Sequence, residues 1–467
     1  MSGFLTGLEC GRCATFYPGD TPRALCDCGG PLLARYDLAA IRAAVTPADI
    51  ARRAPTMWRY RELLPVREDA SIVTMMEGFT PMIPAPKVAR EVGVGELWVK
   101  DEGVNPTGTF KARGASASIS RWKELGVTRF AQPTVGSGGH AWAAYGARAG
   151  VEIHTALPVD CPDLGWKGSL INGAHVYRVD GTVGDAFRIL SEAATRYGWL
   201  NAGAGREPYR VEGKKTMGIE IIEQLGWDLP DAILYPTGGG VGIMGMWKVF
   251  DELEELGWMG SKRPRLVSVQ VAGGAVVKAF HEGLDVCSGA KHMDTIAPGI
   301  MVVKPFSDFL ILRALRATNG WAVGVPDDEI RHFMAWVNRH EGLFLSPEGA
   351  ATIAGVRRMV AEGQLGPASR VVVFNTATGL RYPHLVDGPV PIVPGSGTID
   401  DAAVARARTA ALMGHPDPQG EPRRAGRVSP RLTCALSPRR PARRRVDVVE
   451  TRAVVPEDLA AHLVAEG

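Results

Sequence analysis

The sequence has few cysteines for its length and no long apolar run. Seven cysteines occur in 467 residues, and no apolar stretch approaches the roughly 18 residues that a membrane-spanning helix requires. The first residues, MSGFLTGLEC, lack the basic and apolar regions of a secretory signal. We therefore expect a cytoplasmic protein with no membrane partner, and one that is not built on disulfide bonds.

Acidic residues are scarce in one segment near the C-terminus. Residues 421–445 hold nine arginines and one acid. Because the whole chain has a net charge of only +3, the rest of the chain is mildly acidic. We expect no nucleic-acid partner for that remainder. Residues 386–467 are rich in Pro and Arg and poor in large apolar residues, which predicts a disordered tail. A solvated extension, a segment that binds an acidic partner and an altered reading frame all stay open.

Residues 41–385 are predicted to form one catalytic region of two α/β subdomains with a ligand at their interface. Short β-branched runs predict strands, and longer periodic stretches between them predict helices. The predicted strands are 97–102, 129–133, 151–158, 174–179, 232–236, 265–272 and 370–375, and the predicted helices include 109–125, 140–149, 183–197, 242–256 and 347–362. Regular alternation of strand and helix over this length indicates two doubly wound α/β domains.

Four of the predicted strands end in loops rich in glycine and hydroxyl side chains. Lys111 follows the first of them, Ser137 the second, Gly238–Gly242 the third and Thr376 the fourth. Open α/β sheets bind ligands at the carboxyl ends of their strands. The four loops therefore predict one small-ligand site.

Lys111 and the glycine loop have residue types suited to a particular chemistry. A cation is unfavourable in the first turn of a helix, whereas a lysine held as a neutral Schiff base is not. The consecutive glycines of Gly238–Gly242 let backbone N–H groups turn toward an anion at a helix N-terminus, which suits a phosphate. The loop has neither G-K-[ST] nor G-x-G-x-x-G followed by an acid, so a nucleotide loop is disfavoured. A solvated Lys111 with no chemical role stays open.

Three segments in order resemble those of a known enzyme family. NPTGTFKARG, PTGGGVG and FNTATGLRYP, after a Cys-rich start with GGPL and YDL, look like the threonine synthases. These are pyridoxal-phosphate enzymes of the tryptophan-synthase-β fold group, fold type II. The resemblance reaches about residue 385. It implies pyridoxal phosphate as the cofactor and the α/β fold of that group.

The resemblance also implies roles for single residues. Lys111 would form the Schiff base, and Thr376 would offer its hydroxyl to the pyridine nitrogen. The cofactor phosphate would be held by Gly238, Gly239, Gly240, Val241 and Gly242. Ser137 stands where the family usually has an asparagine that contacts the cofactor's 3′-oxygen, and Ala377 replaces a glycine.

The activity implied is that of a lyase that converts O-phosphohomoserine and water to threonine and phosphate, with an amino acid as substrate and a homodimer as the assembly. Two alternatives stay open: a threonine/serine dehydratase-type ammonia-lyase, and a non-catalytic paralogue that binds pyridoxal phosphate. A dianionic substrate needs cations. The candidates are Arg113, His140, Arg210, Lys214 and Lys215, each of which could equally be solvated or ion-paired.

Residues 1–40 are predicted to form a Cys-rich, zinc-ribbon-like module. Cys10 and Cys13 make one pair, and Cys26 and Cys28 make another. Two close thiolate pairs suit a structural, tetrahedral zinc ion. The C-x-C spacing of the second pair is shorter than usual, so zinc and a metal-free remnant both stay open.

Overall fold

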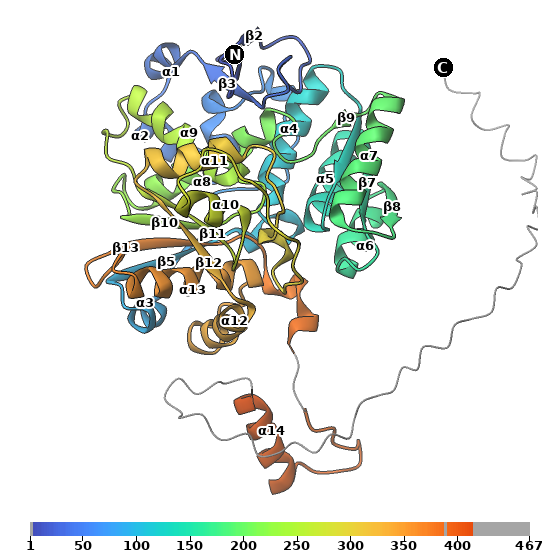
Figure 1. Ribbon diagram of the computed structural model, residues 1–467, viewed down its shortest axis with the longest axis vertical. Helices are drawn as coiled ribbons and strands as arrows, with labels where there is room; N and C mark the ends of the chain where they lie inside the picture. The colour runs from blue at the N-terminus through green and yellow to red at the C-terminus, as the bar shows by residue number, and fades with distance from the viewer. Residues whose placement is uncertain (1–2, 387–389, 414–467) are drawn as a thin grey trace, which may run out of the picture. The chain divides into compact units, whose positions relative to one another are not determined.

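Three β-sheets wrapped by helices make up the described residues, which are 3–386 and 390–413 (Figure 1). The computed structural model divides into a unit Met1–Pro416 and a unit Asp417–Gly467. The second unit lies outside the described residues, so the fold is that of the first. No helix among the described residues combines the length and the hydropathy needed to cross a membrane.

The largest sheet has six strands, and all but one of them are parallel. Their order is β12 (Trp321–Val325), β11 (Arg265–Val271), β10 (Ala232–Pro236), β13 (Arg370–Asn375), β5 (Glu96–Asp101) and β4 (Met82–Pro84). The edge strand β4 is antiparallel to β5. Parallel strands need helical crossovers, so both faces of this sheet are covered.

Side chains of the central strands alternate between two hydrophobic cores. In β10, Ile233 and Tyr235 enter one core while Ala232 and Leu234 enter the other, as the two-residue period of a strand requires. The first core includes α8 (Tyr209–Gln224), α9 (Val241–Glu255), α10 (Ala275–His281) and α11 (Asp308–Ala317). The second includes α3 (Pro86–Val92), α12 (Asp327–Glu341) and α13 (Pro347–Ala361). Figure 1 shows these two groups of helices on opposite faces of the sheet.

The second sheet has four parallel strands. Their order is β8 (His175–Val179), β7 (Glu152–Pro158), β6 (Arg129–Pro133) and β9 (Leu200–Asn201). The helices that follow or precede these strands are α4 (Lys111–Glu124), α5 (Ser137–Ala149), α6 (Asp163–Ile171) and α7 (Val183–Tyr197). α4 and α5 share one core, and α7 shares another with Ala131 and Ala156. This sheet is therefore also covered on two sides.

An antiparallel sheet of three short strands forms the N-terminal module. Its order is β2 (Phe16–Pro18), β1 (Leu5–Cys10) and β3 (Leu32–Tyr36), and α1 (Leu38–Ala44) and α2 (Pro47–Ala51) follow. Leu5, Leu8 and Leu32 lie in the same core as Ile119 and Trp122 of α4. The module therefore packs against the helix that begins with Lys111.

Short 3₁₀ turns connect several of these elements. They are η1 (Met57–Leu63), η2 (Asp69–Ser71), η3 (Glu102–Val104), η4 (Pro106–Gly108), η5 (Pro298–Ile300), η6 (Gly379–Arg381) and η7 (Pro383–Leu385). Of these, η4 and η6 belong to two of the motifs that the sequence marks.

The predicted fold class is confirmed, and the seven predicted strands are present within one residue at each end. The helix predicted over 140–149 begins three residues earlier, at Ser137. The sequence did not indicate this first turn, because it contains Gly138 and Gly139 and glycine is a poor helix former. The structure differs from the predicted disordered tail at α14 (Asp401–Met413), an alanine-rich helix that Asp400 caps by accepting the Ala403 N–H. The remainder of the predicted tail from residue 414 lies outside the described residues.

Candidate active site

One cavity lies at the carboxyl ends of β5, β6, β10 and β13. It is lined by residues from the loops after all four strands, which are the loops that the sequence marks. Lys111, Ser137, Thr376 and the whole of Gly238–Gly242 face it. The structure therefore brings together every residue that the sequence predicts for the small-ligand site.

Lys111 is the first residue of α4. Its Nζ lies 4.2 Å from the centre of the Phe110 ring and makes no hydrogen bond or ion pair with the described residues. Burial and the positive charge of Arg210 lower the pKa of Lys111 to about 8, against an opposing effect of Glu348. A larger fraction of this amine is therefore neutral and nucleophilic near neutral pH than for an exposed lysine.

The glycine loop connects β10 to α9 and forms an anion site. Gly240 is the N-cap of α9, with a φ of +74°, and it has no side chain to cap the helix. The first N–H groups of α9, on Val241 and Gly242, therefore have no intrahelical acceptor and face the cavity with the positive end of the helix dipole. A side chain at Gly238 or Gly240 would collide with the Gly299 carbonyl or with Ile311. The loop thus offers backbone N–H donors to an anionic group, with no side chain in their way.

The loop after β13 holds the Lys111 segment in place. Thr376 is 5% exposed, and its carbonyl accepts the N–H of Phe110 at 3.0 Å. The Thr378 N–H donates to the Gly108 carbonyl, also at 3.0 Å. Two motifs that are more than 250 residues apart in sequence are thus joined by backbone hydrogen bonds. Thr376 lines the cavity on the same side as Lys111's helix.

Ser137 begins α5 in a tightly packed loop. Gly136 before it has a φ of +128°, which only glycine adopts readily. A side chain at Gly139 would lie 2.6 Å from the Thr155 hydroxyl, and one at Gly138 would lie 2.9 Å from the Thr134 hydroxyl. The glycines therefore let the N-terminus of α5 approach the ends of β6 and β7 closely, and this places the Ser137 side chain at the cavity.

Of the five cations that the sequence offers for a substrate anion, the structure places only Arg210 and Lys214 at the cavity. The Arg210 guanidinium lies 5.0 Å from the Trp142 ring centre and 3.7 Å from the Glu207 carboxylate. Lys214 donates to the Phe110 carbonyl. Burial, followed by repulsion from Lys111, lowers the pKa of Lys214.

Arg113 and Lys215 are ion-paired, which is the other interpretation that the sequence left open for each of them. Arg113 is fully buried and donates to Glu102 at 2.6 Å and to Glu220 at 2.7 Å. Lys215 is likewise fully buried, with Glu212 at 2.7 Å and Glu252 at 2.8 Å. Each charge is already compensated inside the protein, so neither side chain is available to a substrate.

His140 does not line the cavity either, but it contacts a residue that does. Its Nδ1 accepts a hydrogen bond from Arg381 at 3.2 Å. Burial and the Arg381 charge lower the pKa of His140 to about 4, so it is neutral at neutral pH. His140 is therefore a partner of a cavity cation and is itself uncharged.

The sequence analysis missed two charged residues of the cavity. Arg381 is 8% exposed and donates to the Thr107 carbonyl at 2.8 Å. It lies inside the FNTATGLRYP motif, which was the available signal. Glu348 is the second residue of α13; its Oε1 accepts the Gly299 N–H at 3.1 Å, and its Oε2 is buried without a hydrogen-bond partner among the described residues. No glycine-rich loop marks Glu348.

The cavity is consequently positive. The charged residues that line it are Lys111, Arg210, Lys214, Arg381 and Glu348. Four basic side chains stand against one carboxylate, and although burial lowers the pKa values of Lys111 and Lys214, the balance favours an anionic ligand. The partnerless amine, the free N–H groups of α9 and the excess positive charge together suit an aldehyde that carries a phosphate, together with an anionic substrate.

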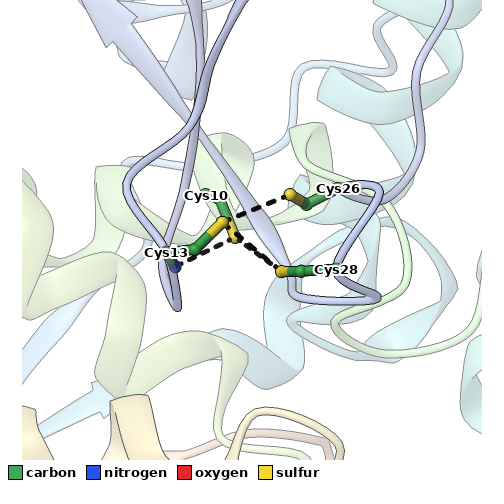
Figure 2. A group of neighbouring side chains, drawn as sticks. All are labelled: Cys10, Cys13, Cys26 and Cys28. Atoms are coloured by element: carbon green, nitrogen blue, oxygen red, sulfur yellow. Dashed lines mark hydrogen bonds between the residues drawn. The ribbon is translucent and has the colours of Figure 1, made fainter.

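The four cysteines of the N-terminal module also come together, away from this cavity (Figure 2). Their sulfur atoms all lie within 4.8 Å of one another. Cys10 and Cys26 are buried, and Cys13 and Cys28 are exposed. All four are free thiols in the structure.

Comparison with known proteins gives a consistent result. Residues 73–377 match the family described as "Pyridoxal-phosphate dependent enzyme". The chain is 34% identical over 379 residues to a protein named "Threonine synthase" of Methanocaldococcus jannaschii, covering 80% of this chain and 93% of that protein. It is 33% identical over 384 residues to a protein of the same name from Methanosarcina acetivorans, covering 81% and 93%.

Solved structures show the same fold at lower identity. Diaminopropionate ammonia lyase from Escherichia coli superposes with a TM-score of 0.58 at 17% identity, covering 67% of this chain and 88% of that one. A threonine deaminase from Solanum lycopersicum superposes with a TM-score of 0.55 at 21% identity, covering 66% and 87%. These two likenesses concern the fold alone.

Proposed function

The chain belongs to the family of pyridoxal-phosphate dependent enzymes and, within it, to the threonine synthases, and we propose that it converts O-phosphohomoserine and water to threonine and phosphate. The observation that carries this proposal is the charge of the cavity. Besides Lys111 and the glycine loop it holds Arg210, Lys214 and Arg381, with only Glu348 opposing them. A phosphorylated amino acid needs these extra cations beyond those that hold the cofactor phosphate.

We assign the cofactor to the residues that the sequence marks. Pyridoxal phosphate, when bound, withdraws electrons from the amino acid attached to it and makes the protons on the neighbouring carbons acidic. Lys111 Nζ is the amine that holds it covalently. The N–H groups of Gly238–Gly242 would receive its phosphate, and the Thr376 hydroxyl would pair with its ring nitrogen. Ser137 would lie toward its 3′-oxygen, with a side chain shorter than the family's asparagine.

After the amino group of the substrate has displaced Lys111, the free Lys111 amine can move protons. Its depressed pKa, about 8, favours the free amine as a base. From the first turn of α4 it can take the α-proton and then a β-proton, pass one to the departing phosphate and return the other to Cγ. Water then adds its hydroxyl at Cβ, and its remaining proton goes to Cα, which completes threonine. Atoms balance, because one water enters and one inorganic phosphate departs.

Arg210, Lys214 and Arg381 bind the carboxylate and phosphate of the substrate in this proposal. Their hydrogen bonds go to uncharged carbonyl and amide oxygens and to the neutral His140 ring, apart from the 3.7 Å contact of Arg210 with Glu207. The charges of Arg210 and Arg381 are thus largely uncompensated by the protein, and a bound anion would favour the charged form of Lys214, which burial disfavours. An uncompensated cation in a buried cavity favours a bound anion.

The alternative reaction is deamination of threonine or serine, which begins with the same α-proton removal. Its substrate carries one carboxylate and no phosphate, so it would leave most of the cavity's positive charge unpaired. We therefore expect deamination only as a slow side reaction. Incubation with O-phosphohomoserine or threonine, followed by quantification of phosphate, threonine and 2-oxo acid, separates the two. Threonine deamination far faster than phosphate release would overturn the proposal.

Arg381 sharpens this experiment. Arg381→Gln removes a positive charge while keeping a hydrogen-bond donor, so the KM for O-phosphohomoserine should rise about 10-fold or more, the cost of a lost charged hydrogen bond of ~1.5–3 kcal/mol. Slow threonine deamination should change much less. The matched control is Arg316→Gln, because Arg316 is half-exposed, pairs with Asp285 and lies away from the cavity.

Three finer expectations are part of the proposal. Free thiols support a reducing cytoplasm. The exposed side chains of Leu170 (55%) and Ile171 (86%) support a subunit contact, so we propose a homodimer, which light scattering of the eluted protein tests. A structural zinc ion is the third, and its support is the geometry of the cysteine cluster.

A further inference from the structure

We propose that Cys10, Cys13, Cys26 and Cys28 bind one Zn²⁺ ion, and that this ion fixes the N-terminal module against α11, the helix that backs the cofactor's glycine loop. The metal site stands on the geometry of the cysteines and does not depend on the reaction proposed above. Its coupling to the cofactor does rest on that proposal.

The sulfur atoms form one group around a common centre. The Sγ–Sγ distance is 3.5 Å for Cys10 and Cys28, for Cys13 and Cys26, and for Cys13 and Cys28. A tetrahedron of sulfurs each ~2.3 Å from zinc has edges of about 3.8 Å. Because Cys13 is equally close to two different cysteines, the arrangement is that of four ligands and not of two separate pairs (Figure 2).

The first turn is shaped for a bound thiolate. The N–H groups of Arg12 and Cys13 point at Cys10 Sγ, at 3.4 and 3.5 Å. Ala14 closes the turn with a φ of +59° and donates to the Cys10 carbonyl at 3.0 Å. The turn therefore folds around the Cys10 sulfur, with two backbone N–H groups directed at it.

The turn at residues 26–30 lets two cysteines with the short C-x-C spacing bind the same ion. Gly29 has a φ of +75° and donates to the Cys26 carbonyl at 2.8 Å, while the Cys26 N–H donates to the Gly30 carbonyl at 3.0 Å. A side chain at Gly30 would lie 2.8 Å from Cys10 Sγ and 3.2 Å from Cys28 Sγ. Glycine at both positions therefore lets Cys26 and Cys28 reach the same centre.

Zinc is the ion that this donor set favours. Four thiolates in a tetrahedron select zinc or iron, and they leave no position open for a substrate. Two of the sulfurs are exposed to solvent, so the ion can be loaded without unfolding the protein. Four thiolates this close to one another would also repel without a cation between them. The site is therefore structural.

The turn that carries Cys10 and Cys13 rests on α11. A side chain at Gly11 would lie 3.0 Å from Leu310 Cδ1, and the Arg12 guanidinium lies 5.5 Å from the Phe309 ring centre. The next residue of α11, Ile311, occupies the space that a side chain at Gly240 would need. Loss of the ion should loosen the module and, through α11, the loop that holds the cofactor phosphate.

Metal content is the direct test. Protein purified without added metal should contain about one zinc per chain by plasma mass spectrometry. Growth in cobalt should give the red-region absorption bands of tetrahedral cobalt thiolate, away from the cofactor's bands. Iron in place of zinc, two disulfides by mass, or four reactive thiols with no metal would each overturn the proposal.

Two variants test the ligand assignment. Cys13→Ser should lose the zinc, whereas Cys161→Ser, which changes a half-buried cysteine outside the cluster, should keep it. Gly30→Ala changes no ligand but crowds two sulfurs, so it should weaken zinc retention roughly 10–100-fold, as other changes next to metal ligands do. Its control is Gly260→Ala, where a side chain meets nothing within 4 Å. Full zinc retention by Cys13→Ser or Gly30→Ala would contradict the geometry.

The coupling has its own readout, which needs no variant. Zinc removed from the folded holoenzyme by a thiol-reactive mercurial and a chelator should lower the melting temperature and speed the release of cofactor from its visible absorbance. Readdition of zinc with a thiol should reverse both changes. If cofactor release is the same with and without zinc, the link through α11 is wrong while the zinc site is retained.

Discussion

At the scale of single residues, the cavity tunes one amine with two opposing charges. Burial has the largest effect and disfavours a proton on Lys111; the charge of Arg210 adds to this effect, and the charge of Glu348 opposes it. A lysine pKa lowered to about 8 means that the proton leaves as the pH rises through that value, so the nucleophilic form dominates above it.

The rate at which cofactor-free protein takes up pyridoxal phosphate should therefore rise with pH and level off above about 8. Arg210→Gln should move this inflection upward, and Glu348→Gln should move it downward. Stopped-flow absorbance across a pH series measures the inflection. Shifts in the same direction for both variants would contradict the assignment.

Lys111→Ala should lose the covalent link to the cofactor but keep some binding, because the N–H donors of Gly238–Gly242 remain. Borohydride reduction followed by peptide mass spectrometry should label Lys111 in the unaltered protein. Lys214→Ala is the matched control: it removes the neighbouring cavity amine and should leave the label on Lys111. A label on any other lysine would show that the site is wrongly assigned.

Ser137→Asn restores the longer side chain at the start of α5. The amide can reach the cofactor's 3′-oxygen directly, so cofactor retention should tighten and turnover should be equal or higher. Dialysis against buffer followed by activity and absorbance measures both. A large loss of activity would mean that this loop is built around serine for another substrate.

At the scale of elements, the cofactor loop depends on how closely α9, α11 and β10 approach one another. Gly240 combines a φ of +74° with contact to Ile311. Both features require glycine, the first because other residues strain there and the second because there is no room for a side chain. The loop is therefore held by packing as well as by its own sequence.

Gly240→Ala should weaken pyridoxal phosphate binding and destabilise the fold by about 2–5 kcal/mol, from left-handed strain of ~1–2 kcal/mol and crowding of ~1–3 kcal/mol. Fluorescence titration of the cofactor and chemical denaturation test the two parts. Gly260→Ala serves again as the control, since its surroundings are open. Unchanged cofactor affinity would show that the loop does not require glycine at this position.

At the scale of the whole molecule, the proposed active site is built from residues that lie well before the C-terminus. The cavity residues run from Thr109 to Tyr382, and the two cores of the large sheet end at Phe374 and Val373. Beyond residue 390, only one hydrophobic side chain among the described residues is buried, that of Ala403 in α14.

Deletion of 414–467 should leave activity, cofactor content and the melting temperature, within a few degrees, as they are. Deletion from 391 onward also removes α14 and should cost little more, because Ala403 is the one buried residue among the described side chains of that segment. Differential scanning calorimetry and the phosphate-release assay compare both with the full chain. A loss of solubility or of cofactor would show that the removed segment packs on the catalytic region.

The sequence by itself determined the elements and motifs whose chemistry is local. Strand and helix periods, the lysine at a helix start and the run of glycines before another helix depend on neighbouring residues alone, so the strands and Lys111, Ser137, Gly238–Gly242 and Thr376 could all be found. The order of the motifs then indicated the family. Whether the four cysteines can share one zinc ion stayed open, because the spacing of Cys26 and Cys28 does not show how the turn at Gly29 and Gly30 folds.

Only the tertiary structure decided which charges face the substrate. Nearly all residues of α8 are buried, the charged ones included. The sequence of this helix therefore does not show which of its cations face the cavity. Arg210 and Lys214, four residues apart, share the side toward the cavity, whereas Lys215 is turned by about 100° into contact with Glu212 and Glu252. A cation's role here depends on whether a carboxylate from another element already meets it, and that pairing is set by how distant segments pack.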